Sequence, residues 1–396
     1  MEKLLQQSEG LVRRTLSRKR RYLFDQVNWK NRLIGIKGAR GTGKTTMLLQ
    51  RLKSLDLPPT LAAYFSLDDL YFTMHQLSEV VEKFYRQGGK YLFVDEVHKY
   101  PGWSTHIKNL YDFYPDLSIV FTGSSIIDIV RQEADLSRRA LMYELFGLSY
   151  REFLEFSEIG TFHPISLDTL LSPAREWRRD FPADFRPLQH FRDYLQLGYY
   201  PFSLEDKEGY GARLNQLIRT IVEYDMAELH DFDIRNAKKM LQLLYVLSAN
   251  VPFKPNLKML AEKSDIHRNT VNSYLHFLEQ ARLIRQLYPA GISVAILQKP
   301  EKIYLDNTNL AYALHPSEPD KGNLRETFFA SQLRVGHQLT YPSQGDFLVD
   351  ENYVFEVGGK SKGNKQLQHI PNGYVVADDT EYPVSQLPLW VFGFLY

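Results

Sequence analysis

Short apolar runs alternate with helical patterns over the first 150 residues. Continuous apolar segments occur at residues 32–38, 60–67, 90–96, 117–125 and 140–148. Strands that are buried on both faces have this continuous apolar character, and helices between them are typical of parallel βαβ units. The pattern therefore predicts an α/β domain with a parallel sheet over residues 1–150.

The pattern changes after residue 150, where helical segments rich in aromatic residues begin. Residues 151–245 read as helical, with a proline-interrupted, loop-rich stretch at 161–187. A helix is expected at residues 238–251, and a helix–turn–helix pattern and a short strand follow it within residues 246–300. Residues 301–396 combine a helical segment with short strands, which predicts a small α/β domain.

Composition narrows the class of protein. The chain has 396 residues, a formal net charge of +1 and no cysteine. This length favours two or three domains, and the missing thiols exclude disulfides, thiolate zinc sites and cysteine nucleophiles. No apolar run approaches the roughly 20 residues that span a bilayer, and the N-terminus lacks a secretory apolar core. We expect a cytoplasmic protein without a membrane partner.

A basic stretch, RRTLSRKRR at residues 13–21, stands near the N-terminus. The simpler interpretation is a solvated helix face. The alternative is an arm that contacts phosphates or a neighbouring subunit.

The strongest motif is GARGTGKT at residues 38–45, which fits the Walker A pattern G-x-x-x-x-G-K-[ST]. Glycines let backbone N–H groups turn toward phosphate oxygens, and the positive end of the following helix dipole faces the same anion. Lys44 would reach the β- and γ-phosphates, and Thr45 would ligate Mg²⁺. We expect the nucleotide to contact Gly38, Ala39, Arg40, Gly41, Thr42, Gly43, Lys44, Thr45 and Thr46.

Two acids follow the apolar run at residues 91–94. Asp95 and Glu96 stand at the carboxyl tip of that expected strand, about 50 residues after the Walker A loop. Asp95 would hold the magnesium ion, and Glu96 would orient and polarise the attacking water. Together with the loop, the pair predicts a Walker B motif.

Two further groups could take part in catalysis. Thr122, Ser124 and Ser125 end the next apolar run, where a polar side chain can hold the attacking water or the γ-phosphate. Arg138 or Arg139 could act as an arginine finger, which would require an oligomer if it were supplied in trans. The alternatives are an ordinary strand end and surface arginines.

These motifs together resemble a widespread family of prokaryotic AAA-type P-loop ATPases. The resemblance rests on the Walker A loop, DEVHKYPGW at 95–103, TGSS at 122–125 and the passage at 137–156. It implies a helical lid over 151–245, a winged helix over 246–300 and a restriction-endonuclease-like PD-(D/E)XK domain over 301–396. It also implies that Ser124 or Ser125 is sensor 1 and that Arg139 is the finger, although Arg138 replaces the family's usual glycine.

The helix–turn–helix stretch has an apolar face and a polar face. Val271, Tyr274, Leu275 and Leu278 would be buried, whereas His267, Arg268, Asn269, Asn272 and Ser273 would be exposed. Such polar side chains can contact phosphates and base edges, so DNA is a candidate partner. Packing or lid duty is the alternative, because the face carries little net positive charge.

Three acids near the C-terminus, Glu326, Asp346 and Glu356, form a candidate second metal site. A PD-(D/E)XK nuclease pairs such acids with a lysine two residues after the glutamate, but position 358 is glycine. Lys360 or Lys362 would have to reach in from the following loop. We therefore expect a retained fold without nuclease activity.

The leading hypothesis is a Mg²⁺-dependent ATPase that acts as a nucleotide-controlled switch. ATP binding would draw the lid and the winged helix toward the P-loop domain, and hydrolysis would release them. The alternatives are a DNA-binding protein whose affinity is set by ATP, and a nuclease effector.

Overall fold

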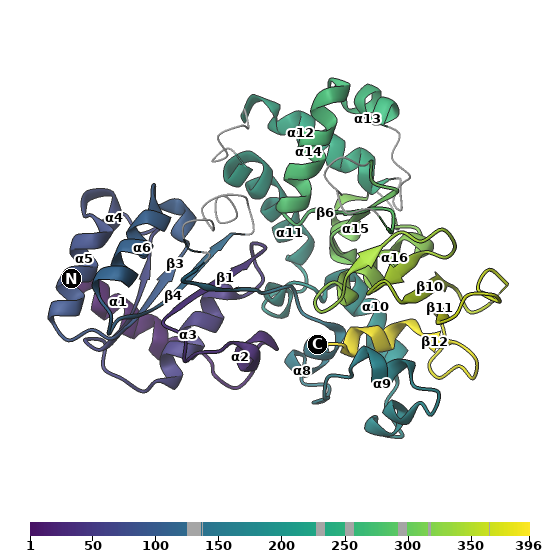
Figure 1. Ribbon diagram of the computed structural model, residues 1–396, viewed down its shortest axis with the longest axis horizontal. Coiled ribbons are helices and arrows are strands. Elements are labelled where there is room, and N and C mark those ends of the chain that lie inside the picture. Colours follow the sequence, from purple (N-terminus) through teal and green to yellow (C-terminus); the bar gives the residue numbers. More distant parts are fainter. Residues whose placement is uncertain are drawn as a thin grey trace. The chain divides into compact units, whose positions relative to one another are not determined.

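The computed structural model describes most of the chain. The described residues are 1–124, 136, 138–226, 234–249, 257–291, 299–315, 318–363 and 365–396. They form two compact units, Met1–Phe146 and Gly147–Tyr396 (Figure 1). The first unit ends close to the predicted boundary at residue 150, whereas the finer division of the second unit into three domains stays a prediction.

The first unit contains a five-stranded parallel sheet, as the alternating pattern predicted. Every apolar run named above contributes one strand, and β1, which precedes the glycine-rich loop, lies between the central strand β4 and the edge strand β5. In spatial order the strands are β2 (Ala62–Ser66), β3 (Tyr91–Asp95), β4 (Ser118–Ser124), β1 (Leu33–Gly38) and β5 (Leu141–Glu144).

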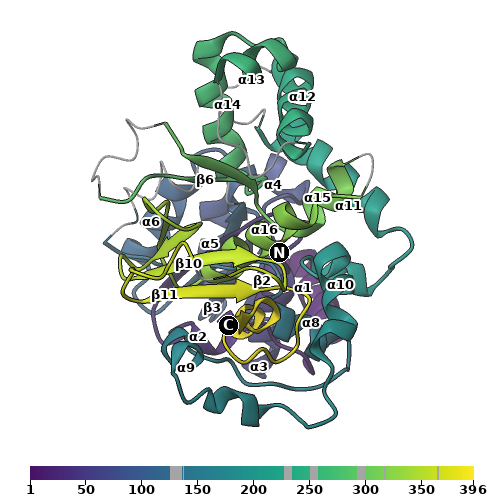
Figure 2. The same ribbon diagram turned by 90° about the vertical axis from the view of Figure 1, so that its right-hand side faces the viewer.

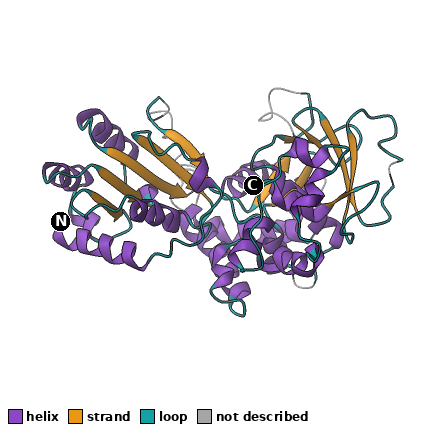
Figure 3. Cartoon of the chain, turned by 90° about the horizontal axis from the view of Figure 1, so that it is seen from below, coloured by secondary structure: helices purple, strands orange, loops and turns teal. Residues whose placement is uncertain are grey.

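Helices cover both faces of this sheet (Figure 3). Successive strand residues point to opposite faces, so Leu33 packs with one layer and Ile34 with the other. One layer contains α5 (Leu77–Arg86) and α6 (Trp103–Phe113), and the other contains α2 (Leu23–Gln26) and α3 (Lys44–Ser54). Two-sided burial explains the continuous apolar runs. Shorter helical turns are α4 (Tyr71–Met74) and η1 (Val97–Lys99).

The basic stretch at residues 13–21 is mostly exposed, as a solvated face would be, but it is not a helix beyond Arg14 and its last residue is buried. Helix α1 (Glu2–Arg14) ends at its second residue, and Arg21 is only 4% exposed. Side chains of α3 hold the extended segment, because Gln50 donates hydrogen bonds to the carbonyls of Leu16 and Lys19. These side-chain hydrogen bonds satisfy main-chain carbonyl groups of the segment that follows the end of the helix.

The second unit contains a mixed five-stranded sheet with α16 (Lys321–Leu333) packed against β10 (Figure 2). Strands β10, β11 and β12 are mutually parallel, whereas β9 runs antiparallel to both β8 and β10. In spatial order the strands are β12 (Leu387–Pro388), β11 (Gly373–Ala377), β10 (Tyr353–Gly358), β9 (Phe347–Val349) and β8 (Leu339–Thr340).

An aromatic core joins the helical region after residue 150 to the end of the chain. Phe181 stacks on Phe185 and meets Trp390 and Phe394 edge-on. The loop-rich stretch at 161–187 therefore carries core residues. The helical elements of these two regions are α8 (Tyr150–Phe156), α9 (Leu167–Leu171), η2 (Glu176–Asp180), α10 (Pro187–Leu197), η3 (Pro201–Leu204) and η8 (Leu389–Phe394).

The remaining helices of this unit follow the order that the helix–turn–helix pattern predicted. Helices α12 (Ala237–Ser248), α13 (Leu257–Ser264) and α14 (Arg268–Gln280) precede the strand pair β6 (Ile284–Leu287) and β7 (Lys302–Leu305). Val271, Tyr274, Leu275 and Leu278 are buried as expected. The strand pair crosses the boundary expected at residue 300. Other helices are α11 (Tyr210–Thr220), the π-helical turn η4 (Ile221–Asp225), η6 (Ile234–Asn236) and α15 (Thr308–Leu314).

Among the described residues, no helix combines the length and the apolarity that crossing a membrane requires.

Candidate functional site

The glycine-rich loop connects the carboxyl end of β1 to the first turn of α3. Gly41 and Gly43 have φ angles of 83° and 94°, in the left-handed region that favours glycine. A Cβ atom at Gly38 would lie 2.3 Å from the carbonyl oxygen of Leu145, so this position also requires glycine. These three glycines give the loop the tight curvature that a phosphate-binding backbone needs.

Lys44 begins α3 and bends back over the loop. Its side chain donates hydrogen bonds from Nζ to the carbonyl oxygens of Gly38 (2.8 Å) and Ala39 (3.0 Å). The residue is 6% exposed, which is unusual for lysine. The Lys44 ammonium therefore lies at the N-terminus of α3, where a phosphate group would be bound.

Asp95 lies at the centre of a hydroxyl cluster at the same edge of the sheet. Its carboxylate accepts hydrogen bonds from Thr45 (2.6 Å), from Tyr64 (2.7 Å) and from Thr122. The donors come from α3, β2 and β4, so the fold joins residues that are far apart in the sequence. Asp95 is 2% exposed, and three neutral donors compensate for its lost hydration.

Tyr64 was not identified from the sequence, where it reads as one aromatic residue in an apolar strand. Burial, and then the charge and hydrogen bond of Asp95, raise the pKa of its hydroxyl well above the ordinary value. The hydroxyl therefore stays protonated and donates to the carboxylate. No spacing rule connects residue 64 to residue 95; their strands are neighbours only in the folded sheet.

Glu96 directly follows Asp95, and its backbone is in the left-handed region, with a φ angle of 54°. Its side chain is 31% exposed, and its Oε2 atom lies 3.2 Å from Nε2 of His98. The other ring nitrogen of His98 accepts a hydrogen bond from the backbone N–H of Ser124 at 3.3 Å. Asp95, Glu96 and Ser124 thus lie close together, whereas Ser125 lies outside the described residues.

Arg21 braces the phosphate loop from behind. This buried side chain donates one hydrogen bond to the carbonyl of Thr42 in the loop and another to the carbonyl of Phe146 at 2.7 Å. Sequence reasoning placed Arg21 in a basic stretch without assigning it this contact. The sequence does not distinguish an exposed arginine from one that donates hydrogen bonds to the loop, because the difference lies in the tertiary contacts.

Arg139 lies at the opposite edge of the sheet from the loop. It precedes β5, whose first residue, Leu141, pairs with Ile34 near the beginning of β1. Its guanidinium makes two hydrogen bonds of 2.9 Å to Asp112, and this bonding lowers the pKa of that carboxyl group. Arg139 therefore does not reach the loop of its own chain, and a role toward another subunit stays a prediction.

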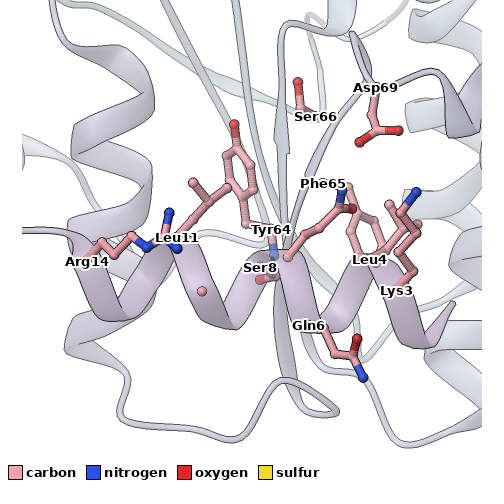
Figure 4. A pocket seen from close by; sticks show the side chains of 12 residues that line it. Lys3, Leu4, Gln6, Ser8, Leu11, Arg14, Tyr64, Phe65, Ser66 and Asp69 are labelled. Atoms are coloured by element: carbon pink, nitrogen blue, oxygen red, sulfur yellow. Dashed lines mark hydrogen bonds between the residues drawn. The ribbon is translucent and has the colours of Figure 1, made fainter.

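A groove of about 490 Å³ lies beside the edge strand β2, between Tyr64, Ser66 and Asp69 on one side and helix α1 on the other (Figure 4). None of the residues that line it belongs to the phosphate loop. Tyr64 forms part of its wall and reaches Asp95 with its hydroxyl. The phosphate-binding geometry therefore comes from the loop and the strand tips, not from this groove.

The C-terminal acids meet lysines in the second unit. Lys302 of β7 places its ammonium 2.8 Å from Glu326 and 3.0 Å from Asp346, and the hydroxyl of Tyr304 donates to Glu326. Burial disfavours the Lys302 ammonium, but the two acids outweigh this effect and raise its pKa. Neither Lys302 nor Tyr304 was identified from the sequence.

Glu356 pairs with a different lysine. Its carboxylate contacts the ammonium of Lys362, one of the two loop lysines that the sequence suggested. Asp346 also accepts a hydrogen bond from the backbone N–H of Val357, at 2.9 Å. Within the described part of the chain, no group of three or more His, Cys, Asp or Glu side chains is arranged to hold a metal ion. The second metal site at Glu326, Asp346 and Glu356 stays a prediction.

Comparison with known protein families identifies the first unit in part. Residues 30–154 match the model of a family described as AAA domain. Residues 188–321 match a second family, described as a domain of unknown function (DUF8612). The segment 30–154 therefore carries an AAA-type P-loop domain. The winged helix and the restriction-endonuclease-like domain stay predictions.

The similar proteins and solved structures have low sequence identity to this chain. The chain is 27% identical over 405 residues to the uncharacterized protein MJ1637 of Methanocaldococcus jannaschii, covering 93% of this chain and 85% of that protein. AMPPCP-bound DnaA from Aquifex aeolicus is 15% identical, with a TM-score of 0.31 over 65% of this chain and 85% of its own. PCH-2 from C. elegans is 16% identical, with a TM-score of 0.22 over 69% and 68%. At these values the structural likenesses carry no conclusion about function.

The bracing contacts of Arg21 generate a stability prediction. Replacing Arg21 with Met removes the donors to two carbonyl groups, one of them buried in the loop. We expect the free energy of unfolding to fall by about 1–3 kcal/mol, the usual cost of an unsatisfied buried group. Urea unfolding of the whole chain measures this change. Arg18→Met is the matched control because Arg18 is exposed in the same segment, and equal stability of the two variants would contradict the bracing role.

The lysine between the C-terminal acids generates a pH-dependent prediction. Lys302→Met leaves Glu326 and Asp346 close together without their shared cation, and we expect a loss of about 3 kcal/mol near pH 8. Burial and the charge of Asp346 already raise the pKa of Glu326, so protonation at pH 5 should relieve part of the loss. Urea unfolding at both pH values tests this. A loss that is larger at pH 5 would contradict the ionic explanation.

Proposed function

We propose that the chain binds ATP together with Mg²⁺ at the loop 38–46 and hydrolyses it. The observation that carries this proposal is the 2.6 Å hydrogen bond between Thr45 and Asp95, formed beside Lys44 and next to Glu96. A hydroxyl and a carboxylate are magnesium ligands by type, and a lysine at a helix N-terminus is a phosphate ligand. The AAA-type domain over residues 30–154 agrees with this chemistry.

Each residue has one task in the proposed reaction. Loop amides and Lys44 bind the β- and γ-phosphates, which spreads the negative charge that develops on the transferred group. Thr45 and Asp95 would hold the magnesium ion, which supplies charge neutralisation between the phosphates when bound. Glu96 accepts the proton of the attacking water, and Ser124 orients that water or the γ-phosphate.

We further propose that hydrolysis serves as a conformational switch. The loop contacts Arg21, and Arg21 contacts Phe146, the last residue of the first unit. A movement of the loop on nucleotide binding would therefore also move Phe146, where the first unit connects to the second. An arginine supplied by another copy of the chain, with Arg139 as the candidate, would complete the site in an oligomer.

DNA binding under the control of ATP is the second candidate function. Helix α14 buries its apolar face, while Asn272 and Ser273 on the helix and His267 just before it are exposed. These side chains can contact phosphates and base edges. Nuclease chemistry is not part of the proposal, because Lys302 and Lys362 already pair with the C-terminal acids.

Two substitutions test the ATPase proposal. Lys44→Ala should abolish measurable ATP binding in calorimetry, because the phosphates lose their cation. Glu96→Gln should retain binding but lower kcat by about 10²–10⁴-fold, the usual contribution of a general base. Lys30→Ala is the control, because Lys30 is an exposed lysine just before β1. Wild-type hydrolysis rates in both test variants would refute the proposal.

A gel-shift titration tests the second candidate. At a stated, low salt concentration the wild-type chain should retard duplex DNA, with an affinity that differs between ATP and no nucleotide. Substituting Asn272 and Ser273 with Ala should weaken the binding. Absence of any shift in either nucleotide state would remove DNA binding as a function.

A further inference from the structure

The side chain of His98 contacts both Glu96, which follows β3, and Ser124, which ends β4. It lies in η1, directly after β3 and Glu96, and its side chain is 7% exposed. On one side, Nε2 is 3.2 Å from Oε2 of Glu96. On the other side, Nδ1 is 3.3 Å from the backbone nitrogen of Ser124, the last residue of β4. A single imidazole ring thus spans two groups of the proposed active site.

The hydrogen-bond roles identify the tautomer of this ring. A backbone N–H can only donate, so Nδ1 accepts the bond from Ser124 and carries no proton. A neutral imidazole then has its proton on Nε2, which faces the Glu96 carboxylate.

The surroundings of the ring keep it neutral. Burial, and then the positive charges of Lys99, Lys44 and Arg40, lower the pKa of His98 to about 3. At neutral pH the ring is therefore a neutral partner whose Nε2 proton faces the Glu96 carboxylate at 3.2 Å, and not a cation.

The proposed role of Glu96 requires a contact that fixes the orientation of its carboxylate. Its carboxylate is partly exposed, and its backbone has the left-handed conformation that residues with a Cβ atom adopt at a cost. A glutamate with three rotatable side-chain bonds can point away from a reacting water. The 3.2 Å contact with a buried ring restricts that freedom.

We propose that His98 is a positioning residue for hydrolysis, which holds the Glu96 carboxylate in the orientation that activates water and ties this orientation to the backbone of Ser124. This inference rests on the proposed ATPase function. His98 touches neither the nucleotide nor the water in this scheme; it acts through Glu96. A displacement of Ser124 by the γ-phosphate would move the ring and, with it, the carboxylate.

Steady-state kinetics of two variants test the proposal. His98→Leu keeps a similar volume but lacks any donor, whereas His98→Gln retains an N–H donor near the position of Nε2. We expect His98→Leu to lower kcat at least tenfold while the Kd for ATP changes less than twofold, and His98→Gln to recover part of kcat. His75→Leu, which replaces an exposed histidine of the same unit, should behave as the wild type.

Three results would overturn the positioning role. They are an unchanged kcat in His98→Leu, a loss that Gln does not relieve, and a parallel loss of kcat, ATP affinity and thermal stability that marks a merely structural residue. If the wild type hydrolyses ATP and His98→Leu does so with the same kcat, only this inference fails. If the wild type hydrolyses no ATP, the proposed function fails as well.

A spectroscopic measurement checks the contact independently of turnover. In ¹⁵N-histidine NMR spectra of the full chain, the His98 signals, assigned by their loss in His98→Gln, should show a proton on Nε2 at pH 7. Glu96→Ala should shift the Nε2 resonance because the acceptor is removed. A proton on Nδ1, or no response to the Glu96 substitution, would contradict the geometry.

Discussion

The burial of one carboxylate, Asp95, is the constraint on which the organisation of the first unit depends. A carboxylate that is 2% exposed must find hydrogen-bond donors inside the protein. It finds them in Thr45, Tyr64 and Thr122, which belong to the helix after the phosphate loop and to the strands on both sides of β3. Satisfying this group therefore fixes the loop, the acid pair and the strand tips relative to one another.

The two units compensate for buried acids in different ways, and the difference has a chemical consequence. Hydroxyl groups surround Asp95, and because these donors are neutral the negative charge remains available to a cation. Glu326 and Asp346 share the ammonium of Lys302, which cancels one of their charges. A divalent ion would have to displace that lysine. This contrast favours metal-assisted chemistry at the phosphate loop over the C-terminal acids.

Much of the first unit could be predicted because its signals are local. Apolar runs predicted all five strands, and the parallel order brings Gly38, Asp95 and Ser124 to the same edge. The supporting residues could not be found in this way. The contacts of Arg21, Tyr64 and His98 join residues that are distant in the sequence, or depend on how a side-chain ring is oriented. Their residue types are also common in ordinary helices, strands and loops.

The sequence by itself determined the parallel α/β domain, the glycine-rich loop with Lys44 and Thr45, and the acids at the end of the third strand, because each depends on the spacing of neighbouring residues. Only the tertiary structure decided which side chains orient those groups. It also decided that Arg139 lies at the far edge of the sheet and that Lys302 lies between two acids and cancels one of their charges. Such pairings form across strands and helices, where sequence distance carries no information about distance in space.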